Sequence, residues 1–478
     1  MRFDTVVSGG HAALPGGPPV AADIAIKDGV IAAIGHDLAN EGEEVVDAGG
    51  LMVLPGAVDS HYHLGIYRGF EEDARSETQS SLAGGVTTIV SYFRTGSHYL
   101  NRSGPYEQML PEVVKATAGN AHTDFAYHLA PMDSGHVREI PRLVEAHGVT
   151  SFKYYMFYKG MDLAGAGQGA SETMSDAYDL GHLFEIMEAV AAVQAERGEE
   201  RISLSIHAEQ SELIRLFMER VREAGTLSGL EAYSAGRPTL TERLAIAEAG
   251  VLAAATACPI NFLHLSSAEA LASAVEFERE HRELDVRLEV TLHHLALSYE
   301  SYSDQRGKVN PPIRSEADRE ALWNGVLRGD VDWVVSDHAC CSESHKEGDL
   351  WSALPGFGGS ALLYPYLLTE GVRRGLPIER VVELASSNPA RAYGLAGRKG
   401  AISVGADADL AAVDLGTVRT VTPEILLSAQ EYTPFEGMEL VGWPVVTMLR
   451  GSVVFRDGAA VGEPSGTYLR EPAVVASA

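Results

Sequence analysis

Hydrophobic and polar positions divide the chain into three stretches with different patterns. The first, residues 1–54, contains short strand-like runs separated by turns, at residues 3–9, 22–27, 30–34 and 44–47. In the second, residues 55–398, short apolar runs alternate with longer amphipathic stretches. The third, residues 399–478, returns to short strands, chiefly at residues 401–413 and 441–454. The pattern therefore changes once from strands to mixed elements and once back.

These stretches predict an α/β fold. Alternating strands and helices are typical of repeated β-α units over a parallel sheet, and residues 55–398 are numerous enough for a (β/α)8 TIM barrel. The strands of the two chain ends can pair with each other across the barrel sequence. We therefore expect residues 1–54 and 399–478 to build one small β-sandwich domain beside the barrel.

Composition narrows the possible partners. With 478 residues, 45% of them hydrophobic, the chain can bury a large core. Its net charge of −29 repels phosphate groups and anionic lipids at long range. Nucleic acid and membrane surfaces are therefore disfavoured as partners, and a small-molecule substrate is expected.

Cysteine usage and the N-terminus indicate the compartment. Three cysteines, Cys258, Cys340 and Cys341, are too few and too unevenly spaced for a disulfide framework, which favours a reducing environment. Residues 1–10 lack the charged and apolar regions of a signal peptide, and no stretch reaches about 18 uninterrupted apolar residues. A cytoplasmic protein is predicted.

Single polar residues at the ends of apolar runs suggest a metal site. His61 and His63 lie on the same face of a predicted strand, because side chains alternate along it. His207, His264 and Asp337 each close a later strand-like run, and the carboxyl ends of barrel strands meet at one mouth. Taken singly, each could be a hydrogen-bonded core histidine or a helix-capping aspartate. Together they form a ligand set that suits zinc, manganese, iron or cobalt.

A lysine inside an apolar strand is the remaining candidate ligand. Lys153 lies in the segment SFKYYMFYKG, residues 151–160. Burial lowers the pKa of a lysine and leaves a neutral amine that can take up carbon dioxide. The resulting carbamate has two oxygens that could bridge two metal ions. We therefore predict N6-carboxylysine at Lys153, although spacing alone does not demonstrate the modification.

The order of these motifs resembles that of the amidohydrolase superfamily. The matching segments are HYH at 61–63, SFK at 151–153, IHAE at 206–209, HLSS at 264–267 and SDH at 336–338. Within the superfamily, residues 151–160 resemble the dihydropyrimidinase, hydantoinase and allantoinase branch, in which a tyrosine follows the carbamylated lysine by five positions. Tyr158 matches that tyrosine. Similar segments continue to residues 432–437, so the resemblance covers nearly the whole chain.

The resemblance implies two divalent metal ions, with zinc the first expectation and manganese, cobalt or iron as alternatives. The implied ligands are His61, His63 and Asp337 for one ion, His207 and His264 for the other, and carbamylated Lys153 as the bridge.

The resemblance also implies catalytic roles. A hydroxide bridging the ions would attack the substrate carbonyl. Tyr158 would donate a hydrogen bond to the developing oxyanion, the alternative being a packed aromatic side chain. Asp337 would pass the proton from the hydroxide to the leaving nitrogen.

Two departures from the family patterns concern the substrate. Leu64 and Gly65 follow His63 where dihydroorotases carry a substrate-binding arginine, which disfavours that activity. Asn310 stands where dihydropyrimidinases usually have serine, and this asparagine resembles the pattern of dihydroorotases and allantoinases. It is a candidate substrate-binding residue.

The predicted activity is hydrolysis of the amide-like C–N bond of a cyclic amide, imide or ureide. An acyclic carbamate, thiocarbamate or phenylurea is the alternative substrate class. A non-catalytic scaffold is disfavoured because every expected ligand position is filled. The resemblance further implies a homodimer or homotetramer. The loops at residues 163–173 and 341–359 are either lids over the active site or surface insertions.

Overall fold

An eight-stranded parallel barrel forms the centre of the computed structural model, which describes residues 2–159, 178–198 and 200–469. Its strands are β8 (Ala57–Tyr62), β9 (Val86–Phe93), β10 (Asp124–Leu129), β11 (Ser151–Tyr155), β12 (Ser203–His207), β13 (Ile260–Phe262), β14 (Val286–Thr291) and β15 (Trp333–Val335). Each pairs in parallel with the next. Just beyond β15, His338 bridges to Tyr62 and its carbonyl accepts from the His63 amide at 2.9 Å, which closes the barrel. The predicted (β/α)8 barrel is confirmed.

Helices follow the strands and cover the barrel. The longer ones are α1 (Phe70–Ala83), α2 (Tyr106–Thr117), α3 (Ser134–His147), α4 (Leu180–Arg197), α5 (Ser211–Ala224), α7 (Thr239–Thr256), α8 (Ala268–Glu280) and α10 (Glu316–Arg328). The shorter ones are α6 (Gly229–Gly236), α9 (Leu292–Ala296), α11 (Leu363–Tyr366), α12 (Ile378–Val382) and α13 (Asn388–Ala392). Local sequence sets their limits. In α3, Asp133 caps the first turn by accepting from the His136 amide, and Gly148 ends the helix at φ 61°.

Both chain ends contribute to a β-sandwich. One sheet has the order β5 (Val30–Gly35), β4 (Asp23–Lys27), β1 (Phe3–Ser8) and β6 (Gly42–Asp47). The other has the order β21 (Ala459–Ala460), β20 (Ser452–Arg456), β19 (Trp443–Leu449), β16 (Leu410–Asp414), β7 (Met52–Pro55), β2 (His11–Ala12) and β3 (Val20–Ala21). The antiparallel pairing of β7 with β16 joins the N-terminal and C-terminal segments.

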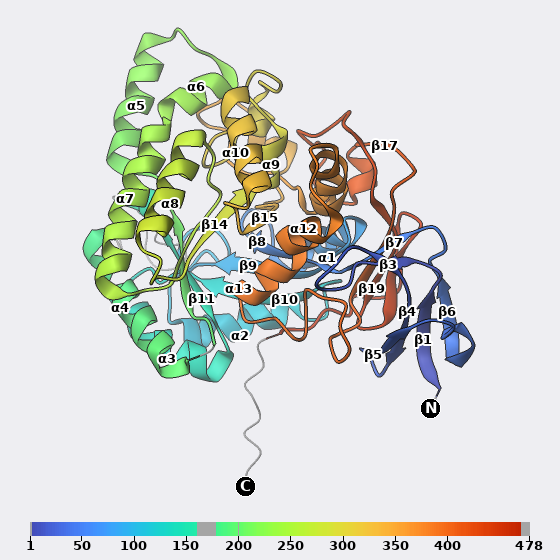
Figure 1. The fold of residues 1–478 in the computed structure, drawn as a ribbon. Helices are drawn as coiled ribbons and strands as arrows, with labels where there is room; N and C mark the ends of the chain where they lie inside the picture. Colours follow the sequence, from blue (N-terminus) through green and yellow to red (C-terminus); the bar gives the residue numbers. More distant parts are fainter. Residues whose placement is uncertain (1, 160–177, 199, 470–478) are drawn as a thin grey trace.

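The sandwich has its own core. Val7 and Ile26 from the first sheet pack with Val53, Leu410 and Met448 from the second. In Figure 1 the blue N-terminal strands lie beside red β19 on one side of the molecule, and the green and yellow helices lie on the other. The predicted sandwich of both chain ends is confirmed. The division at residues 54/55 and 398/399 stays a prediction.

The two predicted lid segments differ in what the structure describes. Residues 163–173 lie outside the described residues. Residues 341–359 follow β15 and include the short 3-10 helix η4 (Glu343–Lys346).

Within the described ranges, none of the helices combines the length and the apolar character that a membrane crossing requires.

Candidate metal centre and substrate cavity

Three predicted ligands from the two strands that close the barrel lie together. His61 is in β8, His63 directly follows it, and Asp337 lies two residues past β15. The Asp337 Oδ1 atom is 3.1 Å from His61 Nε2 and 3.2 Å from His63 Nε2. One ligand atom from each residue lies within 4.8 Å of the other two, and all three residues are buried. This geometry fits a divalent cation.

Lys153 lies beside this group. It occupies the middle of β11, its side chain is buried, and Nζ is 3.0 Å from His61 Nε2 and 3.8 Å from the centre of the Tyr92 ring. Burial lowers the pKa of Lys153 to about 7. Near neutral pH, Lys153 is therefore a neutral amine in a large fraction of the molecules, as carbamate formation requires.

His207 and His264 form the other side of the centre. Their ring centroids are 4.2 Å apart, and the His264 ring lies 5.3 Å from that of His61. Burial lowers the pKa of His207 to about 4, so its imidazole stays neutral, as a metal ligand must be.

His264 provides the clearest sign of a missing partner. Both of its ring nitrogens are buried and have no hydrogen-bond partner among the residues that the structure describes. Buried polar side-chain atoms nearly always have a partner, and an unpaired one needs an explanation such as an ion. The backbone of His264 is also in the left-handed region, at φ 35°, as is Asp337 at φ 52°. Strained backbone of this kind is concentrated at functional sites.

All six predicted ligands thus meet at the carboxyl ends of the barrel strands. The donor set of imidazole nitrogens, a carboxylate and a lysine is chemically suited to two divalent ions once the lysine carries a carbamate. The individual ligand roles remain a prediction.

Two buried glutamates orient these histidines and were missed by sequence reasoning. Glu289 of β14 lies 2.7 Å from His61 Nδ1 through Oε1, and its other oxygen accepts from Trp333 Nε1 at 2.9 Å. Glu209 lies 2.7 Å from His207 Nε2 and also pairs with Arg237. Glu209 closes the IHAE segment and Glu289 lies within an apolar run, but neither position shows what the side chain contacts.

A cavity of about 860 Å³ opens above the centre. Tyr158 and Asn310 both line it, as expected for substrate-binding residues. The Tyr158 hydroxyl accepts a hydrogen bond from Arg94 Nε at 3.3 Å. The Asn310 Oδ1 atom accepts from the Tyr233 hydroxyl at 2.6 Å, which leaves the amide nitrogen as a donor.

Arg94 is a further cavity residue that no motif indicated. It directly follows β9, is only 4% exposed, and lies with its guanidinium 5.1 Å from the centre of the Tyr158 ring and 5.7 Å from that of Tyr99. Tyr99 in turn places its hydroxyl 2.9 Å from His63 Nδ1.

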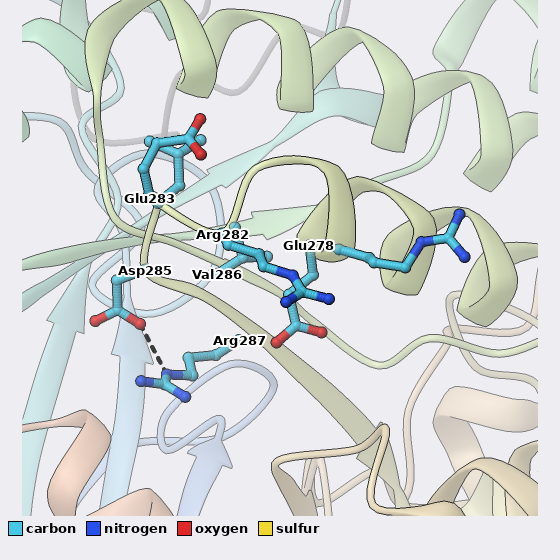
Figure 2. Close-up of a pocket in the computed structure, with 8 residues that line it drawn as sticks. Glu278, Arg282, Glu283, Asp285, Val286 and Arg287 are labelled. Atoms are coloured by element: carbon cyan, nitrogen blue, oxygen red, sulfur yellow. Dashed lines mark ion pairs between the residues drawn. The ribbon is translucent and has the colours of Figure 1, made fainter.

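A second hollow lies at the opposite end of the barrel. It has a volume of about 590 Å³ and is lined by residues 278–279 and 282–287, between the end of α8 and the start of β14. Figure 2 shows its charged side chains, with Asp285 paired to Arg287 at 2.8 Å. None of the predicted ligands lines it, so the cavity above the histidines is the candidate active site.

Comparison with known proteins decides the family. Residues 52–454 match the model of the amidohydrolase family. The chain belongs to this family. It is 34% identical to an allantoinase from Rubrobacter xylanophilus over 98% of both chains, and 31% identical to a D-hydantoinase from Geobacillus stearothermophilus over 94% of this chain and 93% of the relative.

Solved structures of this amidohydrolase branch share the fold over the full length. The L-hydantoinase (dihydropyrimidinase) from Arthrobacter aurescens has a TM-score of 0.84 at 29% identity, covering 98% of this chain and 99% of its own. The predicted resemblance to the dihydropyrimidinase, hydantoinase and allantoinase branch is therefore confirmed.

Proposed function

We propose that this protein is a metal-dependent hydrolase that opens the amide-like C–N bond of a cyclic amide, imide or ureide. The observation that carries the proposal is the buried His264, whose ring nitrogens have no described partner, together with the five other candidate ligands that line the same cavity. Relatives that match nearly the whole chain are named for allantoin and hydantoin, both of which are cyclic ureides.

Two divalent ions are proposed, zinc first and manganese, cobalt or iron as alternatives. His61, His63 and Asp337 would hold one ion and His207 and His264 the other, with N6-carboxylysine at Lys153 between them. When bound, such ions supply an activated water near neutral pH and polarise the substrate carbonyl.

Asp337 is suited to move the proton. Although burial raises its pKa, His61, His63 and Lys153 hold the pKa of Asp337 well below its usual range, so it is a carboxylate at neutral pH. It would accept the proton of the attacking water and deliver it to the leaving nitrogen. The carbonyl carbon gains the oxygen, the C–N bond breaks, and the nitrogen leaves protonated.

Tyr158 is suited to bind the oxyanion. Its oxygen already accepts from Arg94 Nε, so its own proton is free to be donated into the cavity. A donor placed there would stabilise the negative charge that develops on the carbonyl oxygen. Asn310 would contact the substrate through its amide nitrogen, because Tyr233 occupies its oxygen.

The cyclic class is favoured over the alternatives. None of the relatives reported above is named for an acyclic carbamate, thiocarbamate or phenylurea. A non-catalytic scaffold would not need six candidate ligands assembled at the mouth of the barrel.

The test is metal content per chain together with ring opening of hydantoin, dihydrouracil, allantoin and succinimide. Wild type should hold two metal ions and open at least one ring, and Lys153→Ala should lose the activity and at least one ion. The exposed lysine of α2 gives the control, since Lys115→Ala should keep both. Two bound ions without ring opening would contradict the cyclic substrate class. One ion or none in wild type would contradict the bridging role of Lys153.

A cytoplasmic location and a homodimer or homotetramer are proposed as well. All three cysteines are buried and free, which is compatible with a reducing compartment. The assembly rests on the family resemblance alone, and sedimentation of the purified protein would test it.

A further inference from the structure

Arg94 stands out among the buried cations of the cavity. The structure describes three buried arginines, Arg94, Arg237 and Arg314. Arg237 pairs with Glu209, and Arg314 pairs with Glu242 at 2.8 Å. No carboxylate lies within ion-pair distance of Arg94 in the described part of the chain. A buried charge without a counter-ion is costly, so its retention calls for an explanation.

The guanidinium of Arg94 is fixed in place. Nη1 donates to the carbonyls of Thr95 at 3.2 Å and Ser97 at 2.8 Å, and Nε donates to the Tyr158 hydroxyl. The rings of Tyr99 and Tyr158 pack around the cation. The remaining amino group, Nη2, makes no hydrogen bond to any described residue. Arg94 therefore has one donor group to offer to a molecule in the cavity.

The other charges of the cavity do not neutralise Arg94. Glu212 and Asp337 are the carboxylates among its described lining residues. Glu212 pairs with Lys159, and Asp337 lies against His61 and His63. An anion that enters this cavity thus meets an uncompensated guanidinium, although the chain as a whole carries a charge of −29.

We infer that Arg94 binds an anionic substituent of the substrate, so that the preferred substrates are cyclic amides that carry a carboxylate. Arginine is suited to this task because it stays charged and forms strong, charge-assisted hydrogen bonds with carboxylates. Since Arg94 contacts Tyr158, the carboxylate would lie next to the carbonyl that is hydrolysed. The inference rests on the proposed function, and it assigns substrate preference to a residue at the end of β9, not to the position after His63.

The experiment compares substrates that differ only in charge. Hydantoin-5-acetate and hydantoin-5-acetamide have nearly the same shape, and dihydroorotate and dihydroorotamide give a second pair. We expect wild type to favour the carboxylate of each pair at least tenfold in kcat/KM. Arg94→Gln should reduce that preference at least tenfold, mainly through KM, and Arg94→Lys should restore part of it.

The ratio of kcat/KM within a pair distinguishes recognition of the charge from a general loss of activity. A displaced Tyr158 would slow both members of a pair equally and leave their ratio unchanged, which would overturn the inference. A wild-type ratio of kcat/KM near one would also overturn the inference, because it is the result expected if Arg94 donates to a neutral carbonyl. Arg215 is the matched control, because it also lines the cavity but is exposed to solvent. Arg215→Gln should keep the ratio within threefold of wild type.

A measurement of ligand binding tests the role of Arg94 even if the protein does not turn the ligands over. If metal-loaded wild type opens none of these rings and none of hydantoin, dihydrouracil, allantoin and succinimide, the proposed function fails, and calorimetric titration of the two hydantoins then decides on Arg94 alone. Tighter binding of the acetate in wild type, lost in Arg94→Gln, would support an anion site. Equal binding of the acetate and the acetamide would overturn it.

Discussion

Two of the candidate ligand histidines each face a buried carboxylate. His61 turns Nδ1 toward Glu289, and His207 turns Nε2 toward Glu209, both at 2.7 Å. Such partners fix the orientation of an imidazole and leave its other nitrogen for a metal. Burial raises the pKa of Glu289 to about 8, although the hydrogen bond from Trp333 and the charge of Lys153 act in the opposite direction.

Glu289→Gln should weaken metal binding. The substitution keeps the size of the side chain but removes the anionic acceptor of His61, so we expect metal affinity to fall about 10–100-fold. Competition with a coloured chelator measures it. Glu242→Gln is the control, because Glu242 is also buried but pairs with Arg314. Unchanged affinity in Glu289→Gln would refute the orienting role.

Tyr158→Phe should lower kcat about 10²–10³-fold and leave KM of a neutral cyclic amide nearly unchanged, since the lost hydrogen bond belongs to the transition state. Steady-state kinetics measure both constants. Tyr154 gives the matched control because its hydroxyl donates to the Asp179 carbonyl, at 2.7 Å. A kcat of Tyr158→Phe within threefold of wild type would leave Tyr158 as a packed aromatic.

At this scale the sequence indicated the candidate ligands better than the residues that contact them. His61, His63, Lys153 and His207 could be found because single polar residues in apolar strands of a barrel point to its mouth. Arg94 could not be found in this way, because its importance lies in the absence of a described carboxylate partner. That absence depends on which side chains meet in space.

At the scale of elements, two buried lysines hold the loop at residues 341–359. Lys308 Nζ donates to the carbonyls of Leu350 at 2.9 Å and Trp351 at 3.1 Å. Lys346 Nζ donates to the carbonyls of Lys308 at 3.2 Å and Leu354 at 2.7 Å. The loop borders the cavity through Trp351 and Leu354. It is thus placed where a lid would be, and its motion stays a prediction.

Lys346 should make stability depend on pH in the alkaline range. Burial lowers the pKa of Lys346 to about 8, below the ordinary value of 10.5. Below pH 8 both folded and unfolded chains hold the proton, and the buried charge costs about 3 kcal/mol. Between pH 8 and 10.5 the folded chain releases its proton first, so this cost disappears as pH rises.

Lys346→Met removes this titration. We expect its free energy of unfolding relative to wild type to fall by about 2 kcal/mol from pH 7 to pH 10, because only wild type gains stability over that interval. Urea denaturation at both pH values measures the difference. The exposed Lys115 gives the control, and Lys115→Met should show no such trend. A constant difference between Lys346→Met and wild type would show that the pKa of Lys346 is not lowered in the folded chain.

At the scale of the whole molecule, the sequence predicted the architecture well. Strands at both ends and a long alternating middle leave few arrangements, since the chain ends must cover their apolar faces together. The pairing of β7 with β16 bears this out. One contact between the sandwich and the barrel was not predicted, because it is a cluster of charged residues far apart in sequence. Lys399 Nζ lies 2.6 Å from Asp124 Oδ2 of β10 and 2.6 Å from Asp409 Oδ2.

Lys399→Met should destabilise the molecule without impairing the active site. The side chain of Lys399 is 1% exposed, and its loss leaves Asp124 and Asp409 buried with less compensating charge, a change that typically costs about 3–5 kcal/mol. Urea denaturation measures this loss. Because Asp124 begins β10, the cluster lies at the amino-terminal ends of the strands, opposite the cavity, and kcat/KM should stay within twofold. Neighbouring Arg398 pairs with Asp407 at the surface, so Arg398→Met should cost less than about 1 kcal/mol. A loss below about 1 kcal/mol for Lys399→Met as well would show that the ion cluster contributes little to stability.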